Sequence, residues 1–173
     1  MAYIFSECSS LTSLDLTSFD TRQLSDAQHM FSYCSSIKSL NLSNFKTSNL
    51  KIMTSMFGLC SSLISLDISN FDTSNVINME TTFCCCFNLI SLNLSSFNTV
   101  KVQTMRGMFN YCRSLKTLNL KNFDTSNVID MEDIFSECSS LVSINISSFK
   151  TSNTNKMNRF FAGCSSLTSL DLT

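Results

Sequence analysis

Nine cysteines and a recurring column of Asn and Asp are the residues of this 173-residue chain whose types and spacing could support chemistry. Seven of the cysteines recur every 26 residues, at Cys8, Cys34, Cys60, Cys86, Cys112, Cys138 and Cys164. A zinc site needs cysteine pairs a few residues apart, with a second pair or histidines nearby. Only Cys84, Cys85 and Cys86 are adjacent, and the single His29 has no evident partner. The sequence therefore predicts no metal site and no cofactor.

The seven regular cysteines are predicted to form a buried structural ladder of reduced thiols. Neighbouring Cα atoms in an in-register stack would lie about 5 Å apart, which a disulfide could span, but their Cβ vectors would be parallel rather than facing. Free cysteine is among the most buried residue types and behaves as a small hydrophobe. Cys84 and Cys85 fall outside the column. We expect them on the turn between helix and strand, as the more exposed or reactive thiols.

Composition argues against an enzyme and against several classes of partner. One histidine, three glycines and scattered carboxylates provide neither a repeated catalytic triad nor a phosphate-binding loop. A net charge of −1 with 14% charged residues excludes an electrostatic nucleic-acid binder and gives no polybasic membrane patch. No apolar run approaches the roughly 18 residues of a membrane span. The start "MAYIFSECSS" lacks the features of a signal peptide, so the signal of an exported protein would lie outside this chain.

The elements that must position these residues belong to a 26-residue repeat. Its register restarts without insertion or deletion at Phe5, Phe31, Phe57, Phe83, Phe109, Phe135 and Phe161. Each unit continues with the regular cysteine and an LxxLxL triplet, which is Leu11, Leu14 and Leu16 in the first unit. A second phenylalanine and "FDTSN", or a close variant, then turn the chain. This periodicity indicates a stacked repeat architecture.

Each unit carries two periodicities. "SLDLT" and "SINIS" alternate polar and apolar residues, which is typical of a half-buried strand. After "FDTSN", residues such as Val128, Met131, Ile134 and Phe135 are spaced like a short helical stripe. We therefore predict an α/β solenoid of about seven strand–turn–short-helix units with one parallel sheet. It would form a single domain over residues 1–173, with incomplete repeats at both ends.

The full unit, "MF..C.SL..L.L..FDTSNV", resembles the BspA-like leucine-rich repeats over essentially the whole chain. One departure is that Phe stands where the usual Asn follows LxxLxL by three residues. The resemblance implies a surface protein or lipoprotein of bacteria or parasitic protists, at the cell surface or secreted in its full length. It also implies an extracellular surface that binds protein, often in adhesion to host or matrix proteins, and no enzyme activity.

The predicted binding face consists of two outward columns of the strands. The first is Ser13, Ser39, Ser65, Ser91, Thr117, Ser143 and Ser169, and the second is Asp15, Asn41, Asp67, Asn93, Asn119, Asn145 and Asp171. No two Asp are adjacent, which avoids like-charge repulsion across strands about 4.8 Å apart. Calcium would favour adjacent acids, so a calcium role is not expected. Neither column contains an aromatic residue or Arg, and binding should therefore be weak per repeat and strengthened by repetition.

Several alternatives remain at this point. The face could be a plain solvated surface, or its hydroxyls could order water as ice-binding solenoids do. Three glycosylation triplets begin at Asn41, Asn93 and Asn145, but each arises from the repeat pattern itself. The main function hypothesis is a cell-surface binding or adhesion module. The other is a structural protein that assembles end to end, through apolar ends that include Leu167, Leu170 and Leu172.

Overall fold

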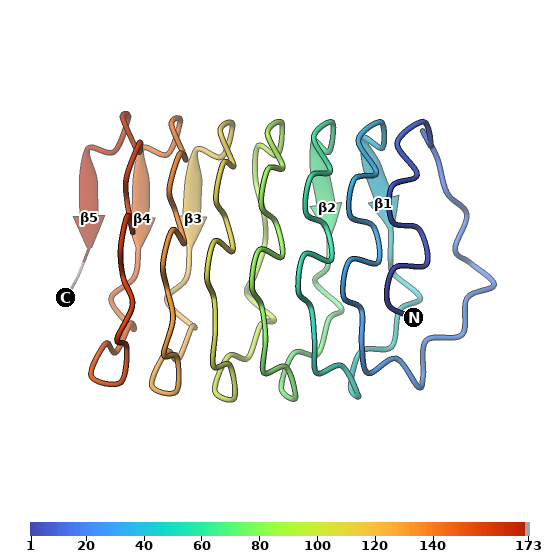
Figure 1. Ribbon diagram of the computed structural model, residues 1–173, viewed down its shortest axis with the longest axis horizontal. Helices are drawn as coiled ribbons and strands as arrows, with labels where there is room; N and C mark the ends of the chain where they lie inside the picture. Colours follow the sequence, from blue (N-terminus) through green and yellow to red (C-terminus); the bar gives the residue numbers. More distant parts are fainter. Residues whose placement is uncertain (172–173) are drawn as a thin grey trace.

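The chain folds into a solenoid whose coils stack side by side along the long axis of the molecule (Figure 1). The computed structural model describes residues 1–171, so Leu172 and Thr173 of the last predicted unit lie outside the described residues. Short strands line one side of the stack, and a series of turns lines the opposite side (Figure 1). The repeat solenoid predicted from the 26-residue period is confirmed by the parallel pairing of equivalent residues.

Within residues 1–171, five short strands carry the alternating pattern. They are β1 (Ser39–Asn41), β2 (Ser65–Asp67), β3 (Thr117–Asn119), β4 (Ser143–Asn145) and β5 (Ser169–Asp171). The strands pair in parallel, and each residue faces its equivalent in the next coil, as Leu40 faces Leu66. The outer residues of β1 are exposed and its central leucine is buried. Parallel pairing in register turns every sequence column into a ladder along the stack.

The prediction of one continuous sheet is wrong, because the strands form two sheets, β1–β2 and β3–β4–β5. The segment between these sheets, residues 91–93, has the repeat pattern but forms no strand. Its Leu92 is only half-buried, whereas Leu66 and Leu118 in the flanking strands are buried. Each strand has only three residues, so losing one or two N–H···O bonds is enough to interrupt the ladder.

The predicted short helices are also wrong, since residues 1–171 contain no α-helix. The segment with the apolar stripe is a run of turns in which every second N–H bonds to the next coil. Phe57 N–H donates to the carbonyl oxygen of Thr82 at 2.9 Å, and Leu59 N–H donates to that of Cys84 at 2.7 Å. A helix would use these N–H groups for carbonyls four residues back. Parallel bridges join this turn side without interruption from Asp26 to Lys156.

Left-handed residues in the turn run explain why a helix cannot form there. Ser55 (φ 50°) and Leu59 (φ 61°) flank Phe57, and the same two positions are left-handed in the other coils. A left-handed residue breaks a right-handed helix and costs an L-residue with a Cβ about 1–2 kcal/mol. Glycine occupies such a position only at Gly107 and Gly163 within the described chain. The cross-coil hydrogen bonds therefore hold a conformation that most of these residues disfavour.

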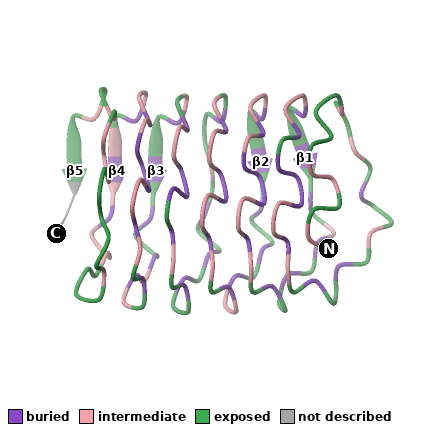
Figure 2. Ribbon diagram, viewed as in Figure 1, coloured by how far each residue is buried: buried purple, intermediate pink, exposed green. Residues whose placement is uncertain are grey.

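Buried backbone segments recur from coil to coil (Figure 2), and columns of equivalent apolar residues fill the interior of the stack. The Phe83 ring stacks on the rings of Phe57 and Phe109 in the neighbouring coils, with both centroid distances at 5.7 Å. The methionine column lies in the same core. Met131 is completely buried, whereas its equivalent in the last coil, Met157, is 39% exposed. The core is therefore continuous along the stack and uncovered at the end coils.

Candidate binding face and thiol sites

The two predicted outward columns lie side by side on the strand face, because alternate residues of a strand point to opposite sides. The exposed members are Ser13, Asp15, Ser39, Asn41, Ser65, Asp67, Ser91, Asn93, Thr117, Asn119 and Ser169, and the half-buried members are Ser143 and Asn145. The side chain of Asp171 is outside the described part of the structure, although its backbone pairs with Asn145. The structure thus brings the two columns together on one face.

The Asn/Asp column also turns the chain at the end of each strand. Asn41 Oδ1 accepts hydrogen bonds from the N–H and the hydroxyl of Ser43, at 3.1 and 2.8 Å. Asp67 accepts the same pair from Ser69, at 3.0 and 2.7 Å. The equivalent backbone bond recurs at Asp15, Asn93, Asn119 and Asn145. Short Asn and Asp side chains favour this bond to the N–H two residues ahead, so one oxygen of these residues is already occupied.

This turn gives the repeated Asn-x-Ser triplets a structural reason, because the third residue supplies the donors for the first. The same donors favour the ionised form of the aspartates in the column. The Thr17 N–H, with its hydroxyl, lowers the pKa of Asp15, and the Ser69 hydroxyl, with its N–H, lowers that of Asp67. The face therefore carries isolated negative charges separated by neutral amides.

The Ser/Thr column differs from the Asn/Asp column, because its hydroxyls take part in no hydrogen bond within the described residues. Its donors and acceptors remain available to solvent or to a ligand. Over β3–β5 the two columns border a shallow groove of about 390 Å³. The groove is lined by Thr117, Leu118, Asn119, Ser143, Ile144, Asn145, Ser169 and Leu170.

An asparagine outside the predicted columns supports the turn after the strand. Asn70 Nδ2 donates to the carbonyl oxygens of Leu42 and Phe45 in the preceding coil, both at 3.1 Å. Asn44 and Asn122 make equivalent bonds. The expected leucine-rich-repeat asparagine is therefore shifted by one position, to the residue before the second phenylalanine. The signal was present in the sequence, as Asn at this position in three of the units.

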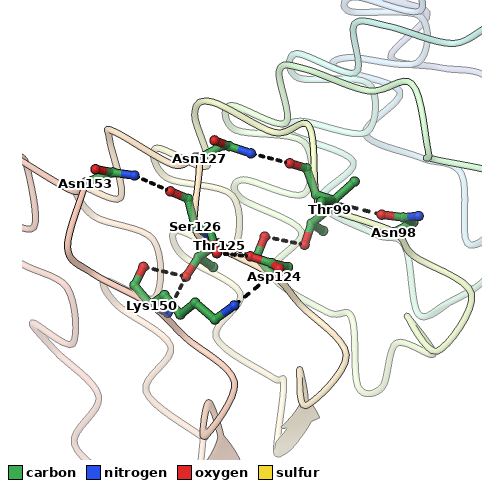
Figure 3. Close-up of polar contacts among 9 residues, drawn as sticks. Asn98, Thr99, Asp124, Thr125, Ser126, Asn127, Lys150 and Asn153 are labelled. Carbon is green, nitrogen blue, oxygen red and sulfur yellow. Dashed lines mark hydrogen bonds and ion pairs between the residues drawn. The ribbon is translucent and has the colours of Figure 1, made fainter.

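In the first five "FDTSN"-type turns a buried threonine joins successive coils, as Figure 3 shows for Thr99 and Thr125. Thr125 Oγ1 donates to the carbonyl oxygen of Lys150 at 2.9 Å and accepts its N–H at 2.7 Å. Thr73 makes the same pair of bonds with Asn98. Each of these hydroxyls therefore satisfies one donor and one acceptor of the next turn, a role that the repeat pattern alone does not reveal.

Opposite charges face each other across neighbouring coils on the turn side. Arg106 lies between Glu80 and Glu132, with N···O distances of 3.7 and 3.4 Å. Lys150 Nζ lies 3.6 Å from Asp124 Oδ2 (Figure 3). Such exposed pairs contribute only about 0–1 kcal/mol each. Their main effect is to avoid the repulsion that identical charges would cause in an in-register stack.

The regular cysteines form a column, and from Cys34 onward each thiol donates to the phenylalanine carbonyl of the preceding coil. Cys60 Sγ lies 3.1 Å from the carbonyl oxygen of Phe31. Cys34, Cys60, Cys86, Cys112 and Cys138 are buried, Cys164 is half-buried and Cys8 is exposed. Burial raises the pKa of Cys60 and of Cys138 to about 12. These thiols are therefore neutral hydrogen-bond donors inside the core.

Cys84 and Cys85 lie apart from this column, half-buried at the turn side with their Sγ atoms 3.4 Å apart. Within residues 1–171, no group of three or more His, Cys, Asp or Glu side chains is placed to hold a metal ion. The same part of the chain contains no helix with the length and hydropathy needed to cross a membrane.

Comparisons with known proteins support the repeat fold. A family model described as "Mycoplasma protein of unknown function, DUF285" matches residues 1–91 and 86–172. The crystal structure of the T. pallidum leucine-rich repeat protein is similar to this chain, with 20% sequence identity and a TM-score of 0.57. The alignment covers 83% of this chain and 60% of that one, so the chain spans less than two thirds of that relative. The likeness concerns the fold.

Two more crystal structures are similar over 98% of this chain. A leucine-rich repeat protein from Bacteroides ovatus has 16% identity, a TM-score of 0.42 and 57% of its own length covered. A leucine-rich cell surface protein from Faecalibacterium prausnitzii has 18% identity, a TM-score of 0.33 and 68% of its length covered. No curated protein matches the chain.

Proposed function

We propose, from the premise that this chain belongs to the DUF285 family of repeat proteins and is a BspA-like leucine-rich-repeat solenoid, that it is a non-enzymatic binding module. Its strand face binds an extended protein surface, such as a host or matrix surface protein. In this proposal the full-length protein presents the solenoid at the cell surface or is secreted, and binding needs no cofactor.

The observation that carries this proposal is the unpaired Ser/Thr column beside the groove over β3–β5. Turn formation uses one oxygen of the Asn/Asp side chains, for example of Asn93, but it uses none of the Ser/Thr hydroxyls. The fold does not require these hydroxyls, yet they recur in every coil at the spacing of parallel strands, about 4.8 Å. A partner with regularly spaced polar groups can bond to several coils at once, so affinity grows with the number of coils engaged.

A paired-face substitution tests the proposal. The change Thr117→Arg together with Ser169→Arg places two bulky cations at exposed positions that line the groove, two coils apart. We expect at least a tenfold weaker affinity for immobilised matrix proteins or host-cell surface proteins, measured by biolayer interferometry, with an unchanged unfolding midpoint. Asn93→Arg is a poorer probe, because it also removes the oxygen that accepts the Ser95 N–H.

Thr54→Arg is the matched control, because it adds the same cation to the turn side. The equivalent position in a later coil is naturally Arg106, so the fold accepts this side chain. Binding that survives Thr117→Arg with Ser169→Arg, but is lost in Thr54→Arg, would assign recognition to the turn side and reject the strand-face proposal.

The second candidate function is self-assembly by end-to-end stacking, and the apolar surface of the last described coil favours it. A groove of about 380 Å³ there is lined by Ile146, Phe149, Thr151, Met157, Phe160, Phe161 and Leu170. In the interior coils the equivalent residues are covered by the next coil, as Met131 is. A coil of a second copy would cover the groove in the same way, and so would a further coil of a longer chain.

Sedimentation velocity over a concentration series separates this candidate from the first. Self-assembly predicts a sedimentation coefficient that rises with concentration, and Met157→Glu should suppress that rise without weakening matrix binding. A monomer at all concentrations would exclude stacking and leave the strand-face proposal intact.

A further inference from the structure

The run Phe83–Phe87 contains two extra cysteines that no other unit has at the equivalent positions. Equivalent positions of Cys84 in the other units hold Ser, Gly, Asn or Ala, and those of Cys85 hold Glu, Tyr, Leu or Gly. Cys86 alone of the three belongs to the buried ladder. The pair is therefore not required by the repeat, and binding at the strand face does not use it.

The two extra thiols are in direct contact on the turn side. The Sγ atoms of Cys84 and Cys85 lie 3.4 Å apart, within sulfur hydrogen-bond distance. Cys84 Sγ is also 3.7 Å from Asn110 Oδ1 in the next coil. Both thiols are half-buried, so they combine partial shelter with access from solvent. This geometry allows one sulfur to carry negative charge while the other donates its proton to it.

The groups around the pair favour the thiolate at Cys85. The titratable or charged residues that act on the two thiols are Cys86, Cys112 and Arg113. Burial keeps the Cys86 and Cys112 thiols neutral by raising their pKa, so Arg113 supplies the positive charge. The Arg113 guanidinium carbon is held 5.2 Å from the ring centroids of both Phe87 and Tyr111.

These contacts divide the pair into an acid and a nucleophile. The hydrogen bond with Cys84, helped by the charge of Arg113, lowers the pKa of Cys85 to about 7. The same hydrogen bond, together with burial, raises the pKa of Cys84. A thiolate available near neutral pH and open to solvent is the reactive form of cysteine.

We propose that Cys85 is a nucleophilic thiol that forms mixed disulfides with small disulfide compounds, and that Cys84 and Arg113 position and stabilise its thiolate. The Cys85 sulfur attacks one sulfur of the compound, and a new S–S bond forms as the old one breaks. The second half of the compound leaves with the electron pair as a thiolate, which solvent protonates. Closure onto Cys84 is disfavoured, because adjacent Cα atoms are about 3.8 Å apart, below the usual disulfide range.

Reaction of the whole chain with dithiobis(nitrobenzoate) tests this proposal. The absorbance of the released nitrothiobenzoate gives the rate, and mass spectrometry identifies the labelled cysteine. We expect the first label on Cys85, with a rate that rises around pH 7. Cys84→Ala should slow labelling at pH 7 about three- to fivefold, and should raise the pH midpoint by more than about one unit. Cys84→Ser keeps a donor and should shift the midpoint less, whereas Cys8→Ser should leave the Cys85 midpoint unchanged.

Folding does not confound these variants. Alanine is the natural residue at the equivalent position, Ala162. Global unfolding would expose all the ladder thiols and release several equivalents of nitrothiobenzoate in the fast phase. Arg113→Gln is a second test of the proposal, and it should raise the pH midpoint of Cys85 labelling by less than Cys84→Ala does. First labelling on Cys8 or Cys164, or a midpoint that neither Cys84→Ala nor Arg113→Gln changes, would overturn the proposal.

Discussion

The strand side and the turn side of this solenoid are built from the same repeat, but they hold the stack together to different extents. Strands pair in two separate sheets, and residues 91–93 interrupt them. On the turn side, bridges run from Asp26 to Lys156 without a gap, and alternate N–H groups bond to the next coil. The turn side also contains the buried phenylalanine stack and the cysteine ladder.

This difference indicates where the fold tolerates change. Residues on the strand face can vary in their outward side chains, because the strands contribute few cross-coil bonds. The turn side is joined to the neighbouring coils by three kinds of contact: backbone hydrogen bonds, stacked phenylalanine rings and bonds from cysteine thiols to carbonyl oxygens. A binding surface is therefore expected on the strand side, and the free energy of folding is expected to depend mainly on the turn side.

Alkaline pH should produce the largest contrast between the two sides. The unfolded thiol has a pKa of about 8.5, whereas Cys60 and Cys138 in the folded core have values of about 12. The buried thiols therefore make their full contribution to the free energy of unfolding below about pH 8.5. This contribution falls as pH rises from there toward about 12, by up to about 1.4 kcal/mol per pH unit for each buried thiol. Urea unfolding under reducing conditions measures this slope.

Cys60→Ala should make the unfolding free energy fall less steeply with pH, by up to about 1.4 kcal/mol per pH unit, which is the contribution of one buried thiol. Substitutions of exposed strand-face residues, such as Ser65→Ala, should leave the slope unchanged. A stability that stays constant from neutral pH to about pH 10 would contradict a ladder of buried neutral thiols.

The phenylalanine stack provides the next largest effect. Phe83→Ala removes a buried ring stacked between Phe57 and Phe109, and should cost about 3–5 kcal/mol of unfolding free energy. Leu92→Ala, at the half-buried position between the two sheets, should cost roughly 1–2 kcal/mol. If chemical denaturation gave equal losses of unfolding free energy for the two variants, the turn side would not contribute more to stability than the strand side.

The buried threonine ladder should have an intermediate effect. Thr73→Val keeps the shape of the side chain but removes both hydrogen bonds to the backbone of Asn98, at an expected cost of about 1–3 kcal/mol. Ser65→Ala removes an exposed hydroxyl without a partner and should change stability by less than about 0.5 kcal/mol. Thermal unfolding of both variants measures the difference, and a neutral Thr73→Val would show that water replaces the lost bonds.

Backbone strain on the turn side gives the smallest effect. Gly107 has φ +58°, and an added Cβ would lie 3.2 Å from Thr81 Cγ2, so Gly107→Ala should cost about 1 kcal/mol. Gly58 has no positive φ, and Ala162 is natural at its equivalent position. Gly58→Ala should therefore be nearly neutral in the same denaturation experiment, although its Cβ would come within 3.2 Å of Ser55 Cβ. Equal effects would mean that the left-handed position carries no cost.

Much of the architecture could be predicted from sequence, because a strict period requires equivalent residues to stack. The parallel solenoid and the burial of the ladder positions depend on this one feature, whereas the leucine-rich-repeat type depends on the LxxLxL spacing within each unit. The predicted helices failed for a specific reason. An apolar stripe spaced like that of Val128, Met131 and Ile134 suits both a helix and a run of turns, and hydrogen-bond partners about 25 residues away distinguish them.

The candidate site was predictable in outline only. The outward columns follow from the alternation within each strand, but the bond from Ser43 to Asn41 and the support from Asn70 depend on how the chain turns after the strand. The contact between Cys84 and Cys85 also could not be predicted, because the left-handed conformation of Cys85 (φ 60°) sets the direction of its side chain.

The sequence by itself determined that equivalent residues stack in register, since no insertion or deletion interrupts its 26-residue period. It also determined which columns are apolar and which are polar. Tertiary structure alone decided where each backbone N–H finds its acceptor, and therefore whether the segment after "FDTSN" is a helix or a run of turns. The physical reason is that a backbone N–H near Phe57 can bond within its own coil or to the next one, and only the presence of a stacked neighbour makes the second choice available.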